Sequence, residues 1–222
     1  GARILGLERR GKYLVFELRR VGEKETFMLL GHLGMTGRMF VMKRGVPLPK
    51  HTAVWFDFGR QRFVYEDPRY FGRMTLDHSA LALLGPEPLS DEFTPARFAT
   101  ALRRFGQAIK VKLLDQTVVA GVGNIYASEA LFRAGISPRL ATRRLNKAQV
   151  RRLRQTVRAV LRQAIRCGST IPLSFAQPGA DGLFYFGRTP GTPDFYEERL
   201  LVYDRAGKPC PRCRTLIKRI VQ

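Results

Sequence analysis

Short apolar runs separated by charged, glycine-containing turns dominate the chain up to about residue 80. Residues 13–18 and 27–30 are two such runs, and residues 53–58 and 62–66 are two more that flank a Gly-Arg-Gln turn. Runs of this length at this spacing are typical of antiparallel strands. The pattern therefore predicts a β-sandwich or a barrel in this part of the chain.

A helical period replaces the strand pattern after a linker at residues 84–89, which has the sequence Leu-Gly-Pro-Glu-Pro-Leu. Thr94 followed by Pro95 predicts the capped start of a helix. Residues 124–134 form a second predicted helix, which Gly135 ends. A helical block is therefore expected to follow the strand-rich block.

A third predicted helix has the clearest amphipathic pattern. It begins at Asn146, which stands in capping-box position to Gln149. Its expected apolar stripe consists of Val150, Leu153, Val157, Val160, Leu161, Ala164 and Ile165. Four arginines on its other faces are expected to form a solvated surface rather than a DNA contact: Arg151, Arg154, Arg158 and Arg162.

The pattern becomes irregular beyond this helix. Residues 176–196 are rich in glycine, proline and aromatic residues and have no period, which is typical of a long functional or mobile loop. Residues 198–204 predict a strand, and residues 206–207 predict a turn.

The net charge of the chain indicates a polyanionic partner. The chain has 39 Lys and Arg residues against 18 Asp and Glu residues, which gives a formal net charge of +21 and a pI near 11.0. Such an excess favours nucleic acid, although a basic surface that only maintains solubility is the alternative. No apolar run approaches the ~18–20 residues that a membrane span needs, and no signal peptide opens the chain. Three cysteines form no disulfide framework, so we expect a reducing, intracellular compartment.

Two of the cysteines, Cys210 and Cys213, stand in a Cys-x-x-Cys motif directly after the predicted turn. Thiolates at this spacing suit half of a tetrahedral zinc site, which needs four ligands. A redox pair or a chance occurrence is the alternative, but no thioredoxin-like context surrounds the motif. The Lys and Arg residues around it fit a zinc ribbon that binds nucleic acid.

A glycine-rich turn precedes the predicted helix at residues 124–134. Gly121 and Gly123 allow the backbone to turn tightly, and the amides at the helix start favour a phosphate. Asn124 can cap the helix or donate to a ligand, and Lys110 adds a positive charge. A plain glycine turn with an asparagine cap is the alternative.

Two further glycine-bounded loops, at residues 32–37 and 67–72, each carry a large apolar side chain. Met35 and Phe71 at the tips of such loops fit wedges between bases, and Arg69 fits a contact with base edges. The alternative is that Met35 and Phe71 belong to the core and that Arg69 is an ordinary surface residue.

Several long motifs together give the chain a family resemblance that extends over almost all of its length. It resembles bacterial formamidopyrimidine-DNA glycosylase of the Fpg/Nei family, the base-excision enzyme for oxidised purines. The resemblance is densest in HLGMTG at 32–37, DPRYFG at 67–72, LGPEPLSDEF at 84–93, the segment 109–136, CGST at 167–170 and VYDRAGKPCPRC at 202–213.

The resemblance implies an α+β multidomain fold. It comprises a β-sandwich domain at residues 1–80, a linker and helix–two-turn–helix domain at 81–170, a capping-loop region at 171–198, and a C-terminal zinc-finger β-hairpin at 199–222. The sandwich is expected to lack its N-terminal part and the zinc finger to be incomplete. Cys210 and Cys213 are then two of the four ligands of one structural Zn²⁺ ion.

The resemblance also implies roles for individual residues. Met35, Arg69 and Phe71 match the trio that fills the gap left by a flipped base, with Arg69 facing the widowed cytosine. Lys12 matches the lysine assigned to the damaged-nucleotide phosphate and to proton donation during β-elimination. His51 matches a histidine that contacts DNA.

The phosphate grip of the helix–two-turn–helix domain is matched by Lys110, Asn124 and Tyr126. Met35 and Phe71 favour the formamidopyrimidine branch over the similar endonuclease VIII branch.

The chain also departs from the family pattern. Family members start with Pro-Glu-Leu-Pro-Glu, whose proline amine attacks the sugar, and Gly1 aligns downstream of that segment. The second cysteine pair and the finger arginine linked to δ-elimination are also absent, so we expect that both ends are missing from this sequence. Tyr70 stands where a second arginine is usual, and the 176–196 loop looks longer than typical.

The implied function is a bifunctional glycosylase and abasic-site lyase that removes 8-oxoguanine and formamidopyrimidines from double-stranded damaged DNA. The enzyme is expected to be monomeric, to have no membrane partner, and to be cytoplasmic and associated with the bacterial nucleoid. A catalytically inactive DNA-binding module of the same fold is one alternative. A zinc-ribbon protein that binds RNA is another.

Overall fold

The structure is a computed structural model that describes residues 1–103, 106–167 and 199–220. The chain divides into two compact units, and the continuous N-terminal part of the first unit ends at residue 82. The strands are β1 (Ala2–Arg10), β2 (Tyr13–Arg20), β3 (Thr26–His32), β4 (Arg38–Lys43), β5 (Thr52–Phe58), β6 (Gln61–Glu66) and β7 (Arg73–Thr75). The helices are α1 (Ser79–Ala82), α2 (Pro95–Arg103), α3 (Ile109–Leu114), α4 (Asn124–Ala134), the short 3-10 helix η1 (Thr142–Arg144) and α5 (Lys147–Cys167).

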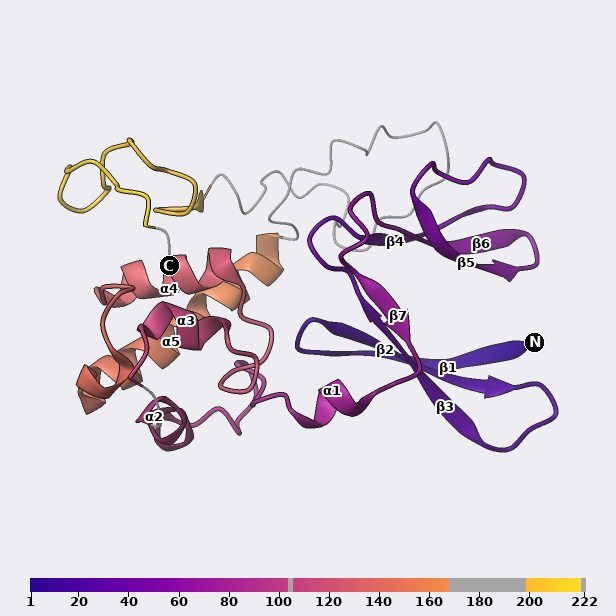
Figure 1. Cartoon of the computed structure of the whole chain (residues 1–222), viewed down its shortest axis with the longest axis horizontal. Coiled ribbons are helices and arrows are strands. Elements are labelled where there is room, and N and C mark those ends of the chain that lie inside the picture. The colour runs from indigo at the N-terminus through magenta and orange to yellow at the C-terminus, as the bar shows by residue number, and fades with distance from the viewer. Residues whose placement is uncertain (104–105, 168–198, 221–222) are drawn as a thin grey trace. The chain divides into compact units, whose positions relative to one another are not determined.

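Two antiparallel sheets form the N-terminal unit (Figure 1). One sheet has the strand order β1-β2-β3-β7 and the other has the order β4-β6-β5. The rings of Phe16 on β2 and Phe63 on β6 meet edge to face with their centroids 5.7 Å apart, so apolar faces of the two sheets pack together. Phe40 and Val64 are buried in the second sheet. The prediction of a β-sandwich is confirmed.

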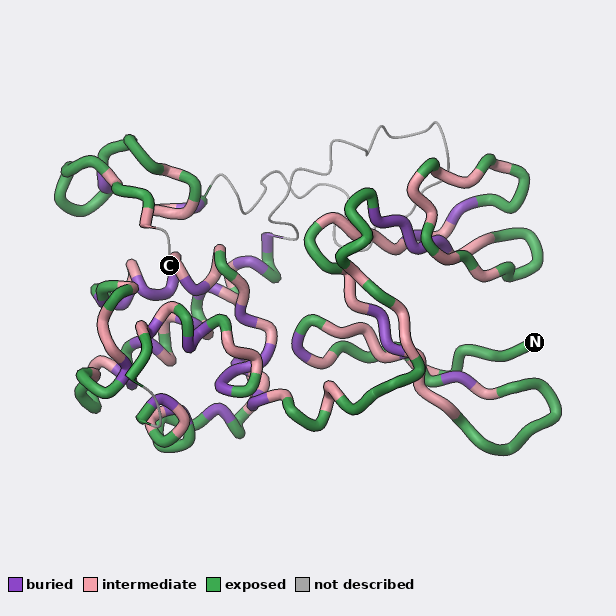
Figure 2. Tube along the Cα trace, viewed as in Figure 1, coloured by how far each residue is buried: buried purple, intermediate pink, exposed green. Residues whose placement is uncertain are grey.

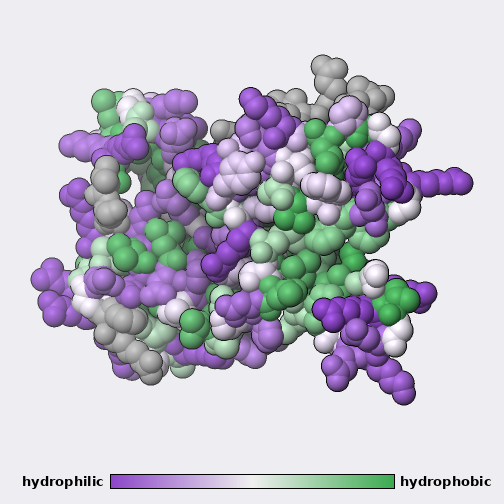
Figure 3. All heavy atoms as spheres, turned by 45° about the vertical axis from the view of Figure 1, so that its right-hand side comes forward, coloured by the Kyte–Doolittle hydropathy of each residue, from purple (hydrophilic) through white to green (hydrophobic). Residues whose placement is uncertain are grey.

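The sequence pattern missed β1, β4 and β7. Most side chains of β1 are exposed, and the strand is held by its backbone ladder with β2, which runs from the pair Ala2–Arg20 to the pair Arg10–Tyr13. An edge strand with few buried side chains leaves no apolar alternation in the sequence. Figure 3 shows one face of the molecule, on which hydrophobic and hydrophilic residues each gather in patches.

The second unit is built around the packing of α4 on α5. Figure 2 shows buried positions recurring along both helices. The predicted boundaries of α4 are confirmed, since Gly135 adopts the left-handed conformation with φ of 64° and ends the helix. The capping box is also confirmed: the Gln149 amide donates to Asn146 Oδ1 at 2.8 Å, and the Asn146 amide donates to Gln149 Oε1 at 3.0 Å. No helix in the described ranges has the length and apolarity of a membrane span.

Two expectations for α5 were wrong. Ile165 is 67% exposed, because it lies roughly 110° around the helix from the centre of the buried stripe. Of the four arginines expected to form a solvated surface, Arg151 and Arg162 are exposed, but Arg154 and Arg158 are not. Nε of Arg154 donates to the carbonyl of Phe93, and Nη1 of Arg158 donates to the carbonyls of Pro88 and Ser90 at 3.0 and 2.8 Å. Both arginines instead fix the segment that precedes α2, because the backbone carbonyls of this segment need hydrogen-bond donors.

The C-terminal segment also differs from its prediction. Residues 199–204 form no strand, and a short hairpin follows, in which Pro209 pairs with Leu216. The whole predicted capping-loop region at 171–198, including the loop at 176–196, lies outside the described residues.

Candidate nucleic-acid interface

The loops at residues 32–37 and 67–72 approach each other closely in the N-terminal unit. A Cβ added at Gly34, whose φ is +64°, would lie 2.6 Å from the amide nitrogen of Gly72 and 2.7 Å from the carbonyl carbon of Phe71. Any side chain at this position would collide with the backbone of the other loop, so glycine is required. The two motifs that are separate in sequence are therefore one structural feature.

Asp67 is fully buried and ties the two loops together. Its carboxylate accepts hydrogen bonds from the Thr36 hydroxyl at 2.6 Å, the Gly72 amide at 2.7 Å, the Arg69 amide at 3.3 Å and the Tyr65 hydroxyl at 3.4 Å. Burial alone would raise the pKa of Asp67, but these hydrogen bonds outweigh it and lower the pKa, so the carboxylate is charged at neutral pH. Burial, followed by the charge of Asp67, raises the pKa of Tyr65 to about 12, so its hydroxyl remains a donor.

Met35, Arg69 and Phe71 form an exposed cluster on these loops. Met35 is 67% exposed and Phe71 is 59% exposed, so the alternative that they belong to the core is wrong. The Arg69 guanidinium lies 4.5 Å from the centroid of the Phe71 ring, and its Nη1 lies 3.9 Å from Met35 Sδ. The structure thus brings the predicted trio together, with two apolar side chains beside one cation.

Lys12 lies in the turn between β1 and β2, next to a row of paired polar residues. Tyr13 pairs with His32 across the sheet with ring centroids 5.1 Å apart, and Arg73 Nη2 donates to the Tyr13 hydroxyl at 3.2 Å. The Lys12 side chain reaches solvent, but the protein around it displaces enough water to lower its pKa. Burial, followed by the charges of Lys12 and Arg73, also lowers the pKa of His32. His32 begins the 32–37 loop, so Lys12 lies near the same feature.

His51 lies in the turn before β5, and its carbonyl accepts the amide of Asp67 at 3.0 Å. It is therefore adjacent to the 67–72 loop. All five residues predicted for the N-terminal unit gather around the two loops.

Lys110 and Asn124 are brought together in the second unit. Lys110 lies on α3 and Asn124 is the first residue of α4, and both line a cavity of about 420 Å³. The N-cap of α4 is Gly123, so of the two options for Asn124 the helix cap is not realised, and Asn124 is exposed. Tyr126 is half-buried and packs against the helical core.

Gln116 shapes the glycine turn and was missed by the sequence reasoning. Its Oε1 accepts the amide of Gly121 at 2.8 Å, while its Nε2 donates to the carbonyls of Val122 at 3.0 Å and Leu114 at 2.9 Å. The sequence offered one signal for this role, which is a glutamine close to a glycine turn. A side-chain amide can satisfy both the donors and the acceptors of such a turn.

Cys210 and Cys213, the two residues predicted to hold zinc, share a tight turn. The Cys210 amide donates to the Thr215 carbonyl at 2.8 Å, and the Arg214 amide donates to the Cys210 carbonyl at 2.9 Å. Hydrogen bonds with Thr215, and then with Cys210, lower the pKa of the Cys213 thiol. Within the described ranges, no group of three or more His, Cys, Asp or Glu residues is placed to hold a metal.

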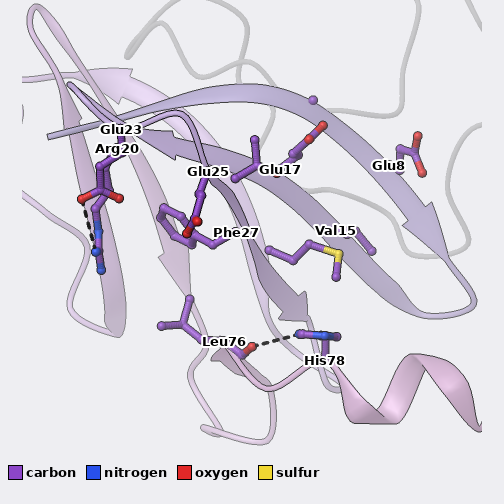
Figure 4. A pocket seen from close by; sticks show the side chains of 12 residues that line it. Glu8, Val15, Glu17, Arg20, Glu23, Glu25, Phe27, Leu76 and His78 are labelled. Atoms are coloured by element: carbon purple, nitrogen blue, oxygen red, sulfur yellow. Dashed lines mark hydrogen bonds and ion pairs between the residues drawn. The ribbon is translucent and has the colours of Figure 1, made fainter.

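A larger cavity of about 630 Å³ lies on the β1-β2-β3 sheet, and none of the predicted site residues lines it. Figure 4 shows Phe27 and Leu76 there, together with the ion pair of Arg20 and Glu23 at 3.6 Å. Four carboxylates surround it, which repels phosphate and argues against a nucleic-acid site: Glu8, Glu17, Glu23 and Glu25.

Two domain profiles match the chain. The formamidopyrimidine-DNA glycosylase N-terminal domain matches residues 1–74, and the formamidopyrimidine-DNA glycosylase H2TH domain matches residues 84–174. The chain belongs to the formamidopyrimidine-DNA glycosylase family. The resemblance drawn from the motifs is confirmed.

Relatives in this family are similar over nearly the whole chain. The formamidopyrimidine-DNA glycosylase of Acidiphilium cryptum is 41% identical over 221 residues, which cover 96% of this chain and 74% of that protein. The Paracoccus denitrificans protein of the same name is 38% identical over 239 residues, which cover 100% of this chain and 79% of that protein.

Solved structures of the family share the fold. The complex between Lactococcus lactis Fpg and DNA containing an abasic site has a TM-score of 0.82 and 32% identity, and the match covers 100% of this chain and 78% of that chain. A complex of a Lactococcus lactis Fpg mutant with DNA containing Fapy-dG has a TM-score of 0.84 and 33% identity, with the same coverage.

Proposed function

We propose that the protein is a base-excision repair DNA glycosylase that removes oxidised purines such as 8-oxoguanine and formamidopyrimidines and that cleaves the abasic site as a lyase. The exposed cluster of Met35, Arg69 and Phe71, on loops fixed by Asp67, is the observation that carries this proposal. An enzyme that acts on a base within a duplex must extrude it and occupy the gap. The names of the relatives support the same substrate class.

Met35 and Phe71 act as wedges in this proposal. Large apolar side chains that enter the stack unstack neighbouring bases and kink the duplex. Arg69 lies against both of them, so its planar guanidinium is presented beside the wedge, where the base left without a partner would face it.

The phosphate backbone is bound by His51 in the N-terminal unit and by Lys110, Asn124 and Tyr126 in the helical unit. The amides at the start of α4 favour an anion next to Asn124. The excess of 21 positive charges adds affinity that does not depend on base sequence.

Lys12 is assigned to the phosphate of the damaged nucleotide and to proton donation during β-elimination. Because the pKa of Lys12 is lowered from its ordinary value, its ammonium group gives up a proton more readily than that of an ordinary lysine. In the chemistry implied by the family, a secondary amine attacks the sugar C1′, the base leaves, and the resulting Schiff base permits elimination of the phosphate. None of the 222 residues matches the proline that supplies this amine.

Cys210 and Cys213 are proposed to supply two thiolates to one structural Zn²⁺ ion. Their shared turn and the lowered pKa of Cys213 fit this assignment, and zinc bound there would fix the turn rather than take part in the reaction. We further propose that the protein acts as a monomer on double-stranded damaged DNA in the cytoplasm, where the nucleoid lies.

The proposal is tested by binding to duplexes that contain either an abasic-site analogue or no lesion. The protein is expected to prefer the damaged duplex, and the double variant Met35→Ala, Phe71→Ala is expected to lose about tenfold or more of this preference, equivalent to ~1.4 kcal/mol. Leu83→Ala, which removes another exposed apolar side chain, is the matched control and should keep the preference.

Equal binding of both duplexes by the unaltered protein would refute the proposal. A stronger preference for RNA would favour the alternative of an RNA-binding zinc ribbon. That alternative gives no role to the loops at 32–37 and 67–72.

A further inference from the structure

Glu129 is a fully buried carboxylate on α4 that the proposed DNA contacts do not use. Its Oε1 accepts hydrogen bonds from the amides of Leu201, Val202 and Tyr203 at 3.0, 2.9 and 3.0 Å, and its Oε2 lies 3.0 Å from the Leu201 amide. Three successive amides thus point at one side chain that is more than seventy residues earlier in the sequence.

This arrangement explains the local backbone at residues 201–203. A carboxylate is costly to bury unless strong hydrogen bonds compensate it, and successive amides directed at one anion do so. Because these amides donate to Glu129, they are not available for a strand ladder. This accounts for the absence of the predicted strand in the described residues 199–204.

The anchored segment leads directly into the C-terminal hairpin at residues 207–217. The Gly207 amide donates to the Ile217 carbonyl at 2.9 Å, and the Ile217 amide donates to the Lys208 carbonyl at 2.9 Å. Few residues separate the anchored amides from this hairpin. Glu129 therefore fixes the base of the hairpin against α4.

Arg212 makes a second connection between the hairpin and α4. Its Nη2 donates to the carbonyl of Arg133 at 3.0 Å, and its guanidinium lies 4.6 Å from the centroid of the Phe132 ring. This contact is at the exposed end of the hairpin and is expected to be weaker than the buried one.

The cavity of about 420 Å³ is formed by both of these parts. Lys110 and Asn124 line it from the helices, and Lys218 and Arg219 line it from the chain that follows the hairpin. Asp204 also contributes to the lining. Three cations in one cavity at the start of α4 form a site for a polyanion.

We propose that Glu129 is a positioning residue that holds Lys218 and Arg219 in the same cavity as Lys110 and Asn124, so that both sides bind one stretch of DNA backbone. This inference rests on the proposed function, since it assumes that the polyanion is DNA. It assigns DNA contacts to Lys218 and Arg219 and explains how a distant buried carboxylate controls them.

The salt dependence of DNA binding tests this inference, because each phosphate contact contributes about 0.9 to the slope of log K against log salt concentration. With an abasic-analogue duplex, the double variant Lys218→Ala, Arg219→Ala is expected to reduce the slope by about 1.8. Glu129→Gln is expected to reduce the slope by a similar amount, because the glutamine NH₂ group opposes the three amides. Combining the two changes should give no further reduction.

Three controls separate positioning from other effects. Lys110→Ala should still remove about 0.9 from the slope in the Glu129→Gln background, which shows that the helical side of the cavity is intact. Lys24→Ala, an exposed lysine in the β2–β3 turn, should leave the slope unchanged. Asp204→Asn removes a negative charge from the cavity without touching the anchor, and it should strengthen binding or leave it unchanged.

Glu129→Asp keeps the carboxylate but draws it back from the amides of residues 201–203, because aspartate is one methylene shorter. This variant tests the inference if Glu129→Gln does not fold. It is expected to give a partial loss of slope and faster amide exchange in residues 199–220 while α5 stays protected. Three outcomes would overturn this inference while leaving the proposed function intact. The folded Glu129 variants could keep the wild-type slope, the losses of slope from the Glu129 change and the double change could add, or Lys218→Ala, Arg219→Ala could have no effect on the slope. Failure of the unaltered protein to bind DNA would instead refute the proposed function.

Discussion

Arg69 shows how one side chain is prepared for recognition before any ligand arrives. Its amide donates to buried Asp67, and its guanidinium is held over the Phe71 ring and beside the Met35 sulfur. A long side chain normally loses rotamer freedom when it binds, and contacts made in advance reduce that loss. If the planar group binds a base edge, as proposed, these contacts lower the entropic cost of that binding.

Replacing Arg69 with alanine should mainly reduce discrimination of the base opposite the lesion. One good contact to a base edge accounts for about 1–3 kcal/mol of discrimination, so the preference for cytosine should fall by roughly five- to 150-fold. Binding to abasic-analogue duplexes with each of the four opposing bases measures this effect. Arg60→Ala, an exposed arginine in the β5–β6 turn, is the control, and equal losses for all four bases would contradict the role.

At the scale of elements, the loops at residues 32–37 and 67–72 act as one unit because they share Asp67. Thr36 donates to its carboxylate from one loop, and the amides of Arg69 and Gly72 donate from the other. The close approach at Gly34 leaves no room for a side chain between the loops. The trio is thus positioned by a buried charge and a glycine that do not themselves face the ligand.

Asp67→Asn should cost about 2–3 kcal/mol of unfolding free energy at pH 7, because one charge-assisted acceptor is lost and an NH₂ group then faces a donor. The folded pKa of Asp67 lies below its unfolded value of about 3.9, so this contribution is fully present above that pH and is lost as the pH falls through the folded pKa. Urea unfolding at pH 7 and at pH 3 checks this. A difference between wild type and variant that stays constant with pH would contradict it.

For the whole molecule, net charge and chemistry make separate contributions. A formal charge of +21 favours binding to any duplex, whereas in the proposed function the exposed trio is expected to distinguish damaged from intact DNA only where a base can be displaced. Binding and covalent catalysis therefore depend on different residues and can be measured separately.

A polypeptide of exactly the 222 printed residues is expected to bind abasic-site DNA without forming a borohydride-trappable Schiff base, since none of these residues matches the proline amine of the family. A protein that begins with the family's Pro-Glu-Leu-Pro-Glu segment should be trapped under the same conditions. Gel analysis after reduction distinguishes the two, and a covalent adduct with the 222-residue polypeptide would show that another amine is the nucleophile.

Local signals in the sequence were sufficient for much of the second unit. Gly135 ends α4 and Asn146 starts α5 as predicted, because caps and left-handed glycines act within a few residues of themselves. The motifs also identified the loops of Met35 and Phe71 as candidates for DNA contact, since glycine boundaries and a large apolar residue are visible in the chain. The sequence alone left open whether these two side chains were exposed.

Tertiary packing decided the features that depend on partners far apart in the chain. The buried carboxylates of Asp67 and Glu129 gained their importance only when distant amides converged on them. Ile165 was misjudged because it lies roughly 110° around α5 from the centre of the buried stripe. The strand β1 was missed because few of its side chains are buried and its ladder with β2 holds it in place. Periodicity and caps are encoded locally, whereas burial and long-range hydrogen bonds exist only after the chain has folded.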